Sequence, residues 1–331
     1  MDLVDTLRKK IDVLEDGDYV TGLKAVLLHI ETAFRHLSRG QDADDETAFT
    51  DAIYRTNQAF EGSVKEAYRV LAGQDPAKKR PFDIENYLEQ NNVFRSRVLS
   101  QLTTYRTEWR NPSAHDYKLD FDESEAFLAI VSVSAFACLL LDQIAERLAY
   151  TRSQAEAEAQ KAALEASLAQ TVNADLLVRV TELLNQFCAI HLPSASSSGR
   201  ATESQVIGAL HGFLSSAAPE LTVQTEARLD AERSFRADLL VSRGGEKVVI
   251  ELKRRLMKQS YANAVAQVEQ YLLIGGIKDG ILLFLPDAPS DMERLDTTIA
   301  GIDGRLVVLS PVGSNPSLNR TASGLRPSAA G

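Results

Sequence analysis

The sequence is poor in the residue that builds disulfide frameworks and structural zinc sites. Among its 331 residues there are only two cysteines, Cys138 and Cys188, and no CxxC pattern. A secreted domain stapled by disulfides and a CxxC-type zinc site are therefore both excluded. The scarcity of cysteine favours a protein of a reducing, cytoplasmic environment.

Positive charge is also scarce. The chain has 36 lysines and arginines against 46 acidic residues, which gives a formal net charge of −10. A protein that holds nucleic acid by bulk electrostatics normally has the opposite excess, so any contact with DNA or RNA must come from a local patch. The candidate nucleic-acid-binding patch is KRRLMK, where Arg254, Arg255 and Lys258 follow Lys253.

Targeting and nucleotide-motor signals are missing as well. The N-terminus, MDLVDTLRKK, has no basic segment followed by an apolar one, so we expect no secretory signal. The most apolar run, 126–141, is shorter than a membrane span and contains two serines, which favours a buried core helix and no membrane association. The lack of a Walker motif and of G-x-G-x-x-G argues against a nucleotide-driven motor.

What the sequence does contain is a change of periodicity near its middle. Through 1–150, apolar residues recur at helical spacing, as between Leu23 and Leu37, and no alternating stretch interrupts them. This pattern predicts an all-α helical bundle, including a long helix over 83–109 and an apolar helix over 124–148.

The second half predicts a different architecture. Residues 151–170 are rich in Ala, Glu and Gln, which favour a solvated helical linker. Short apolar runs over 171–311, with one helix at 261–274 between the third and fourth runs, predict an α/β domain with a mixed sheet. The predicted strands are 221–229, 235–242, 246–253, 279–286 and 305–311. The tail, 312–331, has no apolar period and is expected to be disordered.

Charged residues gather around the strand 246–253. Val249, Glu251 and Lys253 point to one side of it, because side chains alternate along a strand. Asp238 lies in the preceding strand across the short RGGE connection, so the two carboxylates can converge. Two close carboxylates repel unless a cation lies between them, and Mg²⁺ or Mn²⁺ suits such oxygen ligands. The lysine could then orient or deprotonate a water, a combination suited to phosphodiester hydrolysis.

This set resembles the PD-(D/E)XK nuclease superfamily over roughly 171–310. Asp238 matches the hairpin aspartate and Glu251 and Lys253 match the E-x-K, with Ala237 where the family often has proline. The order of predicted helices and strands also agrees with the core of that family. The resemblance implies a metal-dependent nuclease with DNA as the expected substrate.

The same resemblance adds residues on the flanking helices. By analogy, Glu203 on the helix before the sheet is a further metal ligand. Gln267 and Tyr271 on the helix after the third strand are four apart, share a face, and are expected to support the site.

A second cluster, RNPSAHDY at 110–117, lies at the junction of two predicted helices. Asn-Pro is a turn signal, so Arg110 is expected to end one helix and His115 to lie in the loop or at the start of the next. A histidine transfers protons near neutral pH and an arginine clamps a phosphate, which together suffice for metal-independent RNA cleavage.

This cluster resembles the HEPN family, whose motif is an arginine followed a few residues later by a histidine. Asn111 fills the polar position that often follows the arginine, and Tyr117 matches a variant with tyrosine two places after the histidine. The resemblance covers roughly 1–150. It implies catalytic roles for Arg110 and His115, and a homodimer in which two such pairs form one site.

Three functions stay open. The preferred one is a two-domain nuclease of a bacterial defence or abortive-infection type, with a PD-(D/E)XK endonuclease domain behind a HEPN-like bundle. The second is a HEPN ribonuclease toxin whose C-terminal domain senses nucleic acid. The third, a non-catalytic dimeric nucleic-acid-binding protein, is disfavoured by the intact set of Asp238, Glu251 and Lys253. An activating or inhibiting partner is compatible with all three, and no sequence feature identifies one.

Overall fold

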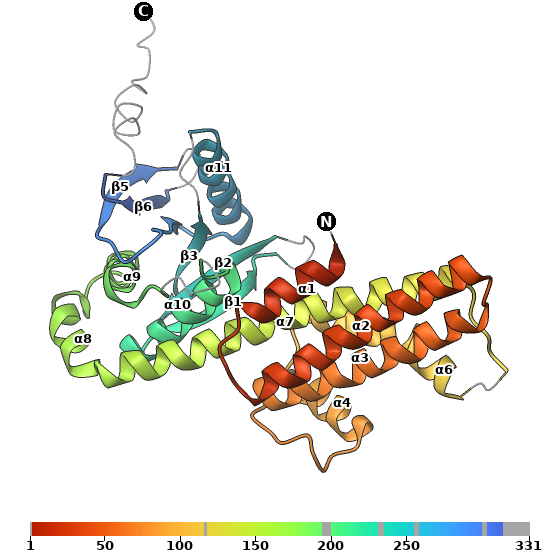
Figure 1. The fold of residues 1–331 in the computed structure, drawn as a ribbon. Helices are drawn as coiled ribbons and strands as arrows, with labels where there is room; N and C mark the ends of the chain where they lie inside the picture. Colours follow the sequence, from red (N-terminus) through yellow and green to blue (C-terminus); the bar gives the residue numbers. More distant parts are fainter. Residues whose placement is uncertain are drawn as a thin grey trace, which may run out of the picture. The chain divides into compact units, whose positions relative to one another are not determined.

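The computed structural model describes residues 2–115, 118–193, 200–230, 235–254, 258–299 and 303–313. The chain divides into two compact units, Met1–Leu148 and the residues from Ala149 onward (Figure 1). The first is helical and the second combines helices with a mixed sheet, as the change of periodicity predicts. The expected disordered tail lies outside the described residues, apart from Val312 and Gly313.

Long amphipathic helices build the first unit. Its helical segments are α1 (Leu3–Asp12), α2 (Asp18–Ala43), α3 (Thr47–Leu71), α4 (Pro81–Gln90), α5 (Ser96–Tyr105), the π-helical turn η1 (Arg106–Arg110), α6 (Asn111–His115) and α7 (Glu123–Ala159), which continues into the second unit. Their apolar faces meet in a core where Phe60 of α3 stacks on Tyr105 of α5, with ring centroids 4.8 Å apart. Phe136 of α7 contacts the same ring of Phe60 at 5.4 Å. Each such buried aromatic contributes about 1.5–3 kcal/mol.

The structure corrects two details of the predicted bundle. The long helix expected over 83–109 is interrupted between α4 and α5, where Asn92 has a left-handed φ of 50° that asparagine tolerates. The turn expected at Asn111 and Pro112 is instead helical, because the wider π-helical turn η1 leads directly into α6. Proline fits the first turn of α6, where its missing N–H costs little.

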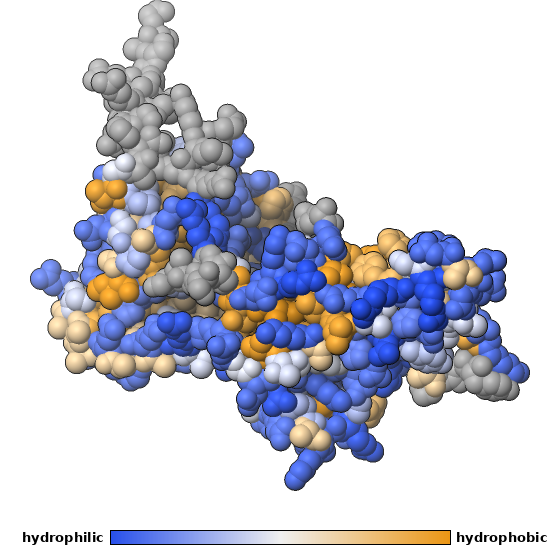
Figure 2. Space-filling view, in the orientation of Figure 1, coloured by the Kyte–Doolittle hydropathy of each residue, from blue (hydrophilic) through white to orange (hydrophobic). Residues whose placement is uncertain are grey.

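Helix α7 is long and apolar enough, by length and composition, to cross a membrane. Half of its most apolar window is nevertheless buried inside the structure, and Val133, Phe136 and Leu140 belong to the bundle core. The run 126–141 therefore forms part of a core helix, as predicted. Hydrophilic side chains dominate the visible surface of each unit, with apolar patches between them (Figure 2).

The expected solvated linker differs from the structure. Residues 151–170 are largely helical, but Ala157, Leu164 and Leu168 are buried in the core of the second unit. Leucines four apart lie on one helix face, so a few apolar residues in an otherwise polar segment suffice to dock it. The segment is thus part of the second unit rather than a connection to it.

Helices lie on both faces of the second unit's sheet (Figure 1). The elements after α7 are α8 (Lys161–Leu168), the 3₁₀ turn η2 (Ala169–Thr171), α9 (Leu176–Gln186), the π-helical turn η3 (Phe187–His191), α10 (Glu203–Ala217), β1 (Thr222–Arg228), β2 (Arg236–Arg243), β3 (Glu246–Lys253), α11 (Lys258–Gly275), β4 (Asp279–Phe284), β5 (Met292–Thr298) and β6 (Arg305–Pro311). In the described residues the sheet has six strands in the order β1-β2-β3-β4-β6-β5. Strands β3, β4 and β6 are mutually parallel, and the remaining pairs are antiparallel. This is the mixed sheet that the sequence predicts.

Strand β3 is central and packs against helices on both sides. Ile250 and Leu252 belong to the core formed with α8, α9 and α10, whereas Val249 belongs to the core formed with α11. On the second face α11 approaches closely, since a Cβ on Gly280 of β4 would lie only 2.9 Å from Val268. A strand that the sequence does not predict, β5, pairs with β6 alone at the sheet edge.

Candidate functional site

A tight turn sets the register of the strands that carry the predicted metal ligands. Gly244 and Gly245 join β2 to β3 and have positive φ angles of 56° and 97°. A two-residue hairpin needs this left-handed backbone at both central residues, and glycine adopts it without steric cost. The antiparallel ladder that follows has Asp238 and Glu251 in register immediately beyond its last pair.

Beyond the last backbone pair of the β2–β3 ladder, the side chain of Asp238 rather than the backbone of β2 accepts a hydrogen bond from β3. Its Oδ2 accepts a hydrogen bond of 2.7 Å from the backbone N–H of Leu252. Residues two apart in a regular strand face the same side, yet Ala237 lies in the core with α11 and Leu239 in the opposite core. In the neighbouring strand β1, Glu226 has a left-handed φ of 47°. The irregularity turns Asp238 toward β3.

Glu251 and Lys253 lie on the face of β3 expected from strand alternation. Glu251 is only 3% exposed, and its Oε1 accepts a hydrogen bond of 2.7 Å from Nζ of Lys253. The other oxygen, Oε2, is buried and has no hydrogen-bond partner among the described residues. A buried, unsatisfied carboxylate oxygen is costly and needs a ligand or a proton.

Burial and mutual repulsion perturb all three charged groups. Burial, and then the charge of Glu251, raise the pKa of Asp238 to about 7. Burial also raises the pKa of Glu251, against the hydrogen bond and charge of Lys253. Burial acts to lower the pKa of Lys253, but the hydrogen bond and charge of Glu251 outweigh it, so this pKa is raised. The two acids thus compete for one proton or one cation.

Glu203 begins α10 and lies within electrostatic range of the same site. Thr202 caps this helix, since its Oγ1 accepts from the N–H of Gln205 while the Gln205 side chain accepts from the N–H of Thr202. This capping box fixes the helix start. The charge of Glu203 contributes to the raised pKa values of both Asp238 and Glu251.

Gln267 and Tyr271 of α11 meet each other, as their spacing predicts. Nε2 of Gln267 donates a hydrogen bond of 2.6 Å to the Tyr271 hydroxyl oxygen, which leaves the tyrosine proton free to donate elsewhere. Burial raises the pKa of Tyr271, and the charges of Glu251 and Asp238 add to that effect. The phenol is therefore within electrostatic range of both carboxylates.

The predicted basic patch is only partly described. Arg254 is exposed and its guanidinium donates to the backbone carbonyl of Ala201. Arg255 lies outside the described residues. Lys258 is the first residue of α11, and its side chain also lies outside the described part.

A divalent cation fits part of this arrangement. Asp238 and Glu251 supply oxygen ligands of the kind that Mg²⁺ and Mn²⁺ prefer, and the unpaired Oε2 of Glu251 is one of them. Over the ranges that the structure describes, no three acidic, histidine or cysteine side chains lie close enough to hold an ion together. Glu203 is therefore not grouped with the other two as a third ligand. Water and phosphate oxygens would complete the coordination, as is usual for Mg²⁺.

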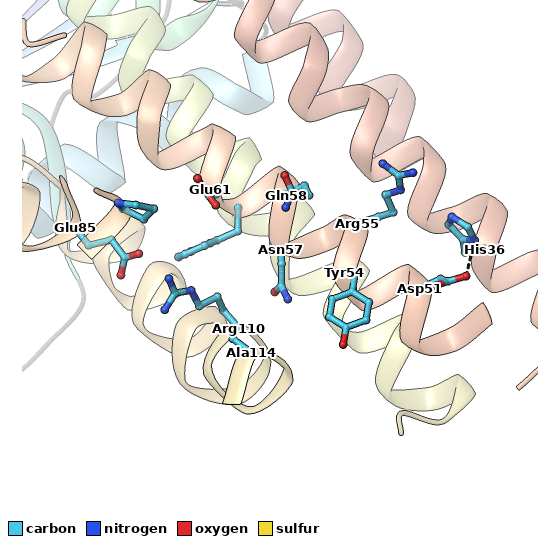
Figure 3. A pocket seen from close by; sticks show the side chains of 12 residues that line it. His36, Asp51, Tyr54, Arg55, Asn57, Gln58, Glu61, Glu85, Arg110 and Ala114 are labelled. Carbon is cyan, nitrogen blue, oxygen red and sulfur yellow. Dashed lines mark ion pairs between the residues drawn. The ribbon is translucent and has the colours of Figure 1, made fainter. Parts of the chain in front are cut away.

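Of the residues predicted in the first unit, Arg110 lines a pocket (Figure 3). Arg110 ends η1, and its Nη1 donates a hydrogen bond of 3.1 Å to Oδ1 of Asn111. His115 ends α6, but its side chain, like the whole of Tyr117, lies outside the described part. The structure therefore joins Arg110 to Asn111 and leaves the predicted contact with the histidine undescribed.

The pocket has a volume of about 650 Å³ and is lined by residues of α2, α3 and α4 besides Arg110. Tyr54, Arg55 and Gln58 come from the outward face of α3, at spacings of one, three and four residues. Figure 3 shows Arg110 on the opposite wall from this helix, with the His36 and Asp51 pair at one end.

The sequence does not single out Tyr54, Arg55 or Gln58. Their helical spacing is visible, but the polar face of any amphipathic helix has the same pattern. The one usable signal is an exposed tyrosine beside an arginine on such a face, and it is weak.

Comparisons with protein-family models, with curated proteins and with solved structures returned no match for the chain.

Proposed function

We propose that the second unit is a metal-dependent phosphodiesterase that acts on DNA, with Mg²⁺ or Mn²⁺ as cofactor. One observation supports the proposal most strongly. The half-buried carboxylate of Asp238, the buried carboxylate of Glu251 and the ammonium of Lys253 converge at one end of the β2–β3 pair. A structural ion pair with one lysine needs one carboxylate. A second acid at the same place costs free energy, and such costs mark functional sites.

Each side chain has a role in this proposal. Asp238 and Glu251 would hold the ion, which when bound supplies a Lewis acid for the phosphate and a water of lowered pKa. Lys253, hydrogen-bonded to Glu251, would orient or deprotonate the attacking water and stabilise charge that develops on the phosphate. Tyr271, held by Gln267, can donate its proton to a phosphate oxygen.

The resemblance to the PD-(D/E)XK superfamily supports the same activity and the choice of DNA. It also supports a role in bacterial defence or abortive infection, in the cytoplasm. The homodimer implied by the HEPN resemblance is part of the proposal and concerns the first unit only.

The test is cleavage of labelled duplex DNA and single-stranded RNA, with Mg²⁺ or with EDTA. We expect DNA cleavage that needs Mg²⁺ and is lost in Asp238→Ala and Lys253→Ala. Lys247→Ala is the matched control, because Lys247 is an exposed lysine of the same strand. Cleavage that survives EDTA, or that both site variants retain, would refute the assignment.

A second candidate function belongs to the first unit. Arg110 lines a pocket and makes no ion pair with any described residue, which favours a role toward an anionic ligand such as an RNA phosphate. RNA cleavage that survives EDTA and is lost in His115→Ala would establish this ribonuclease. If neither DNA nor RNA is cleaved under any of these conditions, the function that remains is that of a non-catalytic nucleic-acid-binding protein.

A further inference from the structure

Glu226 has a backbone conformation that neither its residue type nor its place in the fold favours. Its φ of 47° lies in the left-handed region, inside strand β1. Among the described residues, the other non-glycine residues with positive φ are Asp44, at the end of α2, and Asn92, near the end of α4. Aspartate and asparagine tolerate this conformation, whereas a glutamate inside a strand adopts it only at a cost in free energy. Strain of this kind persists only where the surrounding structure holds it, and it is common at functional sites.

The strained residue lies directly opposite Asp238. The β1–β2 ladder pairs the residues on either side of Glu226 with those on either side of Asp238, but it does not pair these two with each other. Asp238 also lies just beyond the last pair of the β2–β3 ladder, which joins Leu239 to Ile250. The strain and the proposed metal ligand thus occur at the same level of the sheet.

Both strands change face at this level. Side chains an even number of residues apart face the same side of a regular strand. In β2, however, Ala237 and Leu239 lie in opposite cores. Val223 of β1 likewise packs against the core formed with α9 and α10, whereas Leu229, six residues later, packs against the core formed with α11. An irregularity of this kind in a strand can re-aim a side chain next to an active site.

The change of face explains how Asp238 reaches β3. A side chain of a regular strand stands roughly perpendicular to the sheet, away from the backbone of the neighbouring strand. Oδ2 of Asp238 instead accepts a hydrogen bond of 2.7 Å from the backbone N–H of Leu252, so this side chain lies close to the plane of the sheet. Because Leu252 follows Glu251, the same rotation brings the two carboxylates together.

Two simpler reasons for the strain are weaker. Oε2 of Glu226 lies 3.3 Å from Nη1 of Arg236, but both side chains are partly exposed, and such an ion pair contributes little to stability. An irregular edge strand also discourages pairing with another chain, and β1 is an edge strand. That role requires an irregularity somewhere along β1, but not at the level of Asp238.

We propose that Glu226 is a positioning residue of the phosphodiesterase site, and that its left-handed backbone, rather than its carboxylate, turns Asp238 toward the metal. The inference rests on the proposed function and adds a residue that lies outside the motif. Glycine adopts positive φ without steric cost, so it should replace Glu226 without loss of the site. Residues that avoid positive φ should not replace it.

The first test compares stability in EDTA by urea denaturation. Glu226→Gly relieves the strain and Glu226→Ala does not, so the glycine variant should unfold at the higher urea concentration. Gln224, an exposed residue of the same strand without positive φ, is the control. There Gln224→Gly should be less stable than Gln224→Ala, because glycine weakens a regular strand. A Glu226→Gly chain that is less stable than Glu226→Ala overturns the proposal.

The second test measures Mn²⁺ binding to the full-length chain by isothermal titration calorimetry, and Asp238→Ala defines the binding that belongs to this site. Glu226→Gly should keep the affinity within about twofold. Glu226→Val favours extended backbone and should weaken binding at least about tenfold, the usual effect of losing a residue that orients a metal ligand. Glu226→Pro fixes φ near about −65° and should abolish binding.

Two results of this titration contradict the proposal. If the valine variant, or a folded proline variant, binds Mn²⁺ as tightly as the unsubstituted chain, Asp238 is positioned without Glu226 and the strain belongs to the sheet edge. If Glu226→Gly loses the affinity, the carboxylate itself is required. Circular dichroism verifies folding, and the valine variant decides the matter where proline prevents folding.

Failure of the proposed function gives a different result. If the unsubstituted chain binds no Mn²⁺ and cleaves no DNA, that function is refuted, and a mutant cycle in EDTA tests the position of Asp238 alone. Asp238→Ala should shift the urea midpoint equally in the unsubstituted and Glu226→Gly chains. In the Glu226→Val chain, where the hydrogen bond to Leu252 is already lost, the shift should be less than about half as large. Equal shifts in all three chains refute the positioning role.

Discussion

Glu251 in the second unit and Glu85 in the first are both buried glutamates beside a cation, yet their surroundings differ. Glu85 shares Arg106 with Glu89, and neither acid leaves a buried oxygen unpaired. Glu251 shares Lys253 with Asp238, and its Oε2 has no partner within the described chain. Both arrangements have two acids to one cation, so what distinguishes the second is its buried carboxylate oxygen without a hydrogen-bond partner among the described residues.

The same contrast applies to cations. In the second unit Lys253 is held against an acid on a central strand, while in the first unit neither Arg55 nor Arg110, which line a pocket, forms an ion pair with a described residue. A cation that acidic residues hold in place can stabilise charge at one position in a reaction. A cation without an acidic partner can bind an anionic ligand instead. The two candidate sites are thus distinguished by an unsatisfied carboxylate oxygen in one unit and by arginines without a described ion-pair partner in the other.

The largest expected effect comes from making one substitution in both units. Glu251→Gln keeps the side-chain shape but removes a proposed metal ligand, so Mg²⁺-dependent DNA cleavage should fall about 10³-fold. Glu85→Gln should leave the cleavage rate unchanged. Single-turnover cleavage of a fluorescent duplex measures both, and equal losses in the two variants would remove the distinction between the glutamates.

Packing of the segment after α7 is the next test. Leu168 is 2% exposed in the core of the second unit, so Leu168→Ala should lower the free energy of unfolding by about 3 kcal/mol. The neighbouring Glu165 is exposed, and Glu165→Ala should change little. Urea denaturation followed by circular dichroism compares them. If the two variants are equally stable, the segment is a solvated linker, as its composition predicts.

A smaller effect is expected at the wall of the first unit's pocket. The Tyr105 hydroxyl lies 2.7 Å from Oγ1 of Thr56 and 2.9 Å from Oδ1 of Asn57. Tyr105→Phe leaves these buried acceptors without that donor and should cost about 1.5 kcal/mol. Trp109 is the single tryptophan and lies in this unit, so its fluorescence during urea denaturation reports the change. An unchanged midpoint would show that the hydroxyl is dispensable.

The last expected effect concerns pH. Because the pKa of Asp238 is raised from 3.8 to about 7, the folded chain keeps a proton that the unfolded chain has released between these values. The free energy of unfolding in EDTA should therefore fall as the pH rises through this window. Asp238→Asn should flatten the profile, and Asp291→Asn, at an exposed aspartate, should not. Stability that rises over the same range would contradict the inferred burial of charge.

The convergence of Asp238, Glu251 and Lys253 could be predicted because the relevant geometry is local. A period of two places Glu251 and Lys253 on one face, and a two-glycine turn aligns β2 with β3. The break in alternation at Asp238, in contrast, depends on the partner strand β1 and leaves no mark in the sequence.

Elements held by backbone bonds or by distant packing could not be predicted. Strand β5 contains Glu293, Arg294 and Asp296 and pairs on one side only, so hydrogen bonds to β6 define it without an apolar pattern. The pocket of the first unit depends on where α4 and η1 come to lie against α3, which helix periodicity does not specify. The sequence shows Leu164 and Leu168 as apolar residues four apart. Their burial, however, depends on the core of the second unit, against which they pack.

The turn at Gly244 and Gly245 lies at the far end of the hairpin from the carboxylates, yet it controls them. One inserted residue would slide β2 against β3 and send alternate side chains to the wrong face. The proposed phosphodiesterase site would then be lost although all of its acidic and basic residues are retained. A change in the length of this turn alone could thus destroy the proposed site. A sequence search that checks only for the motif residues would still count such a chain as active.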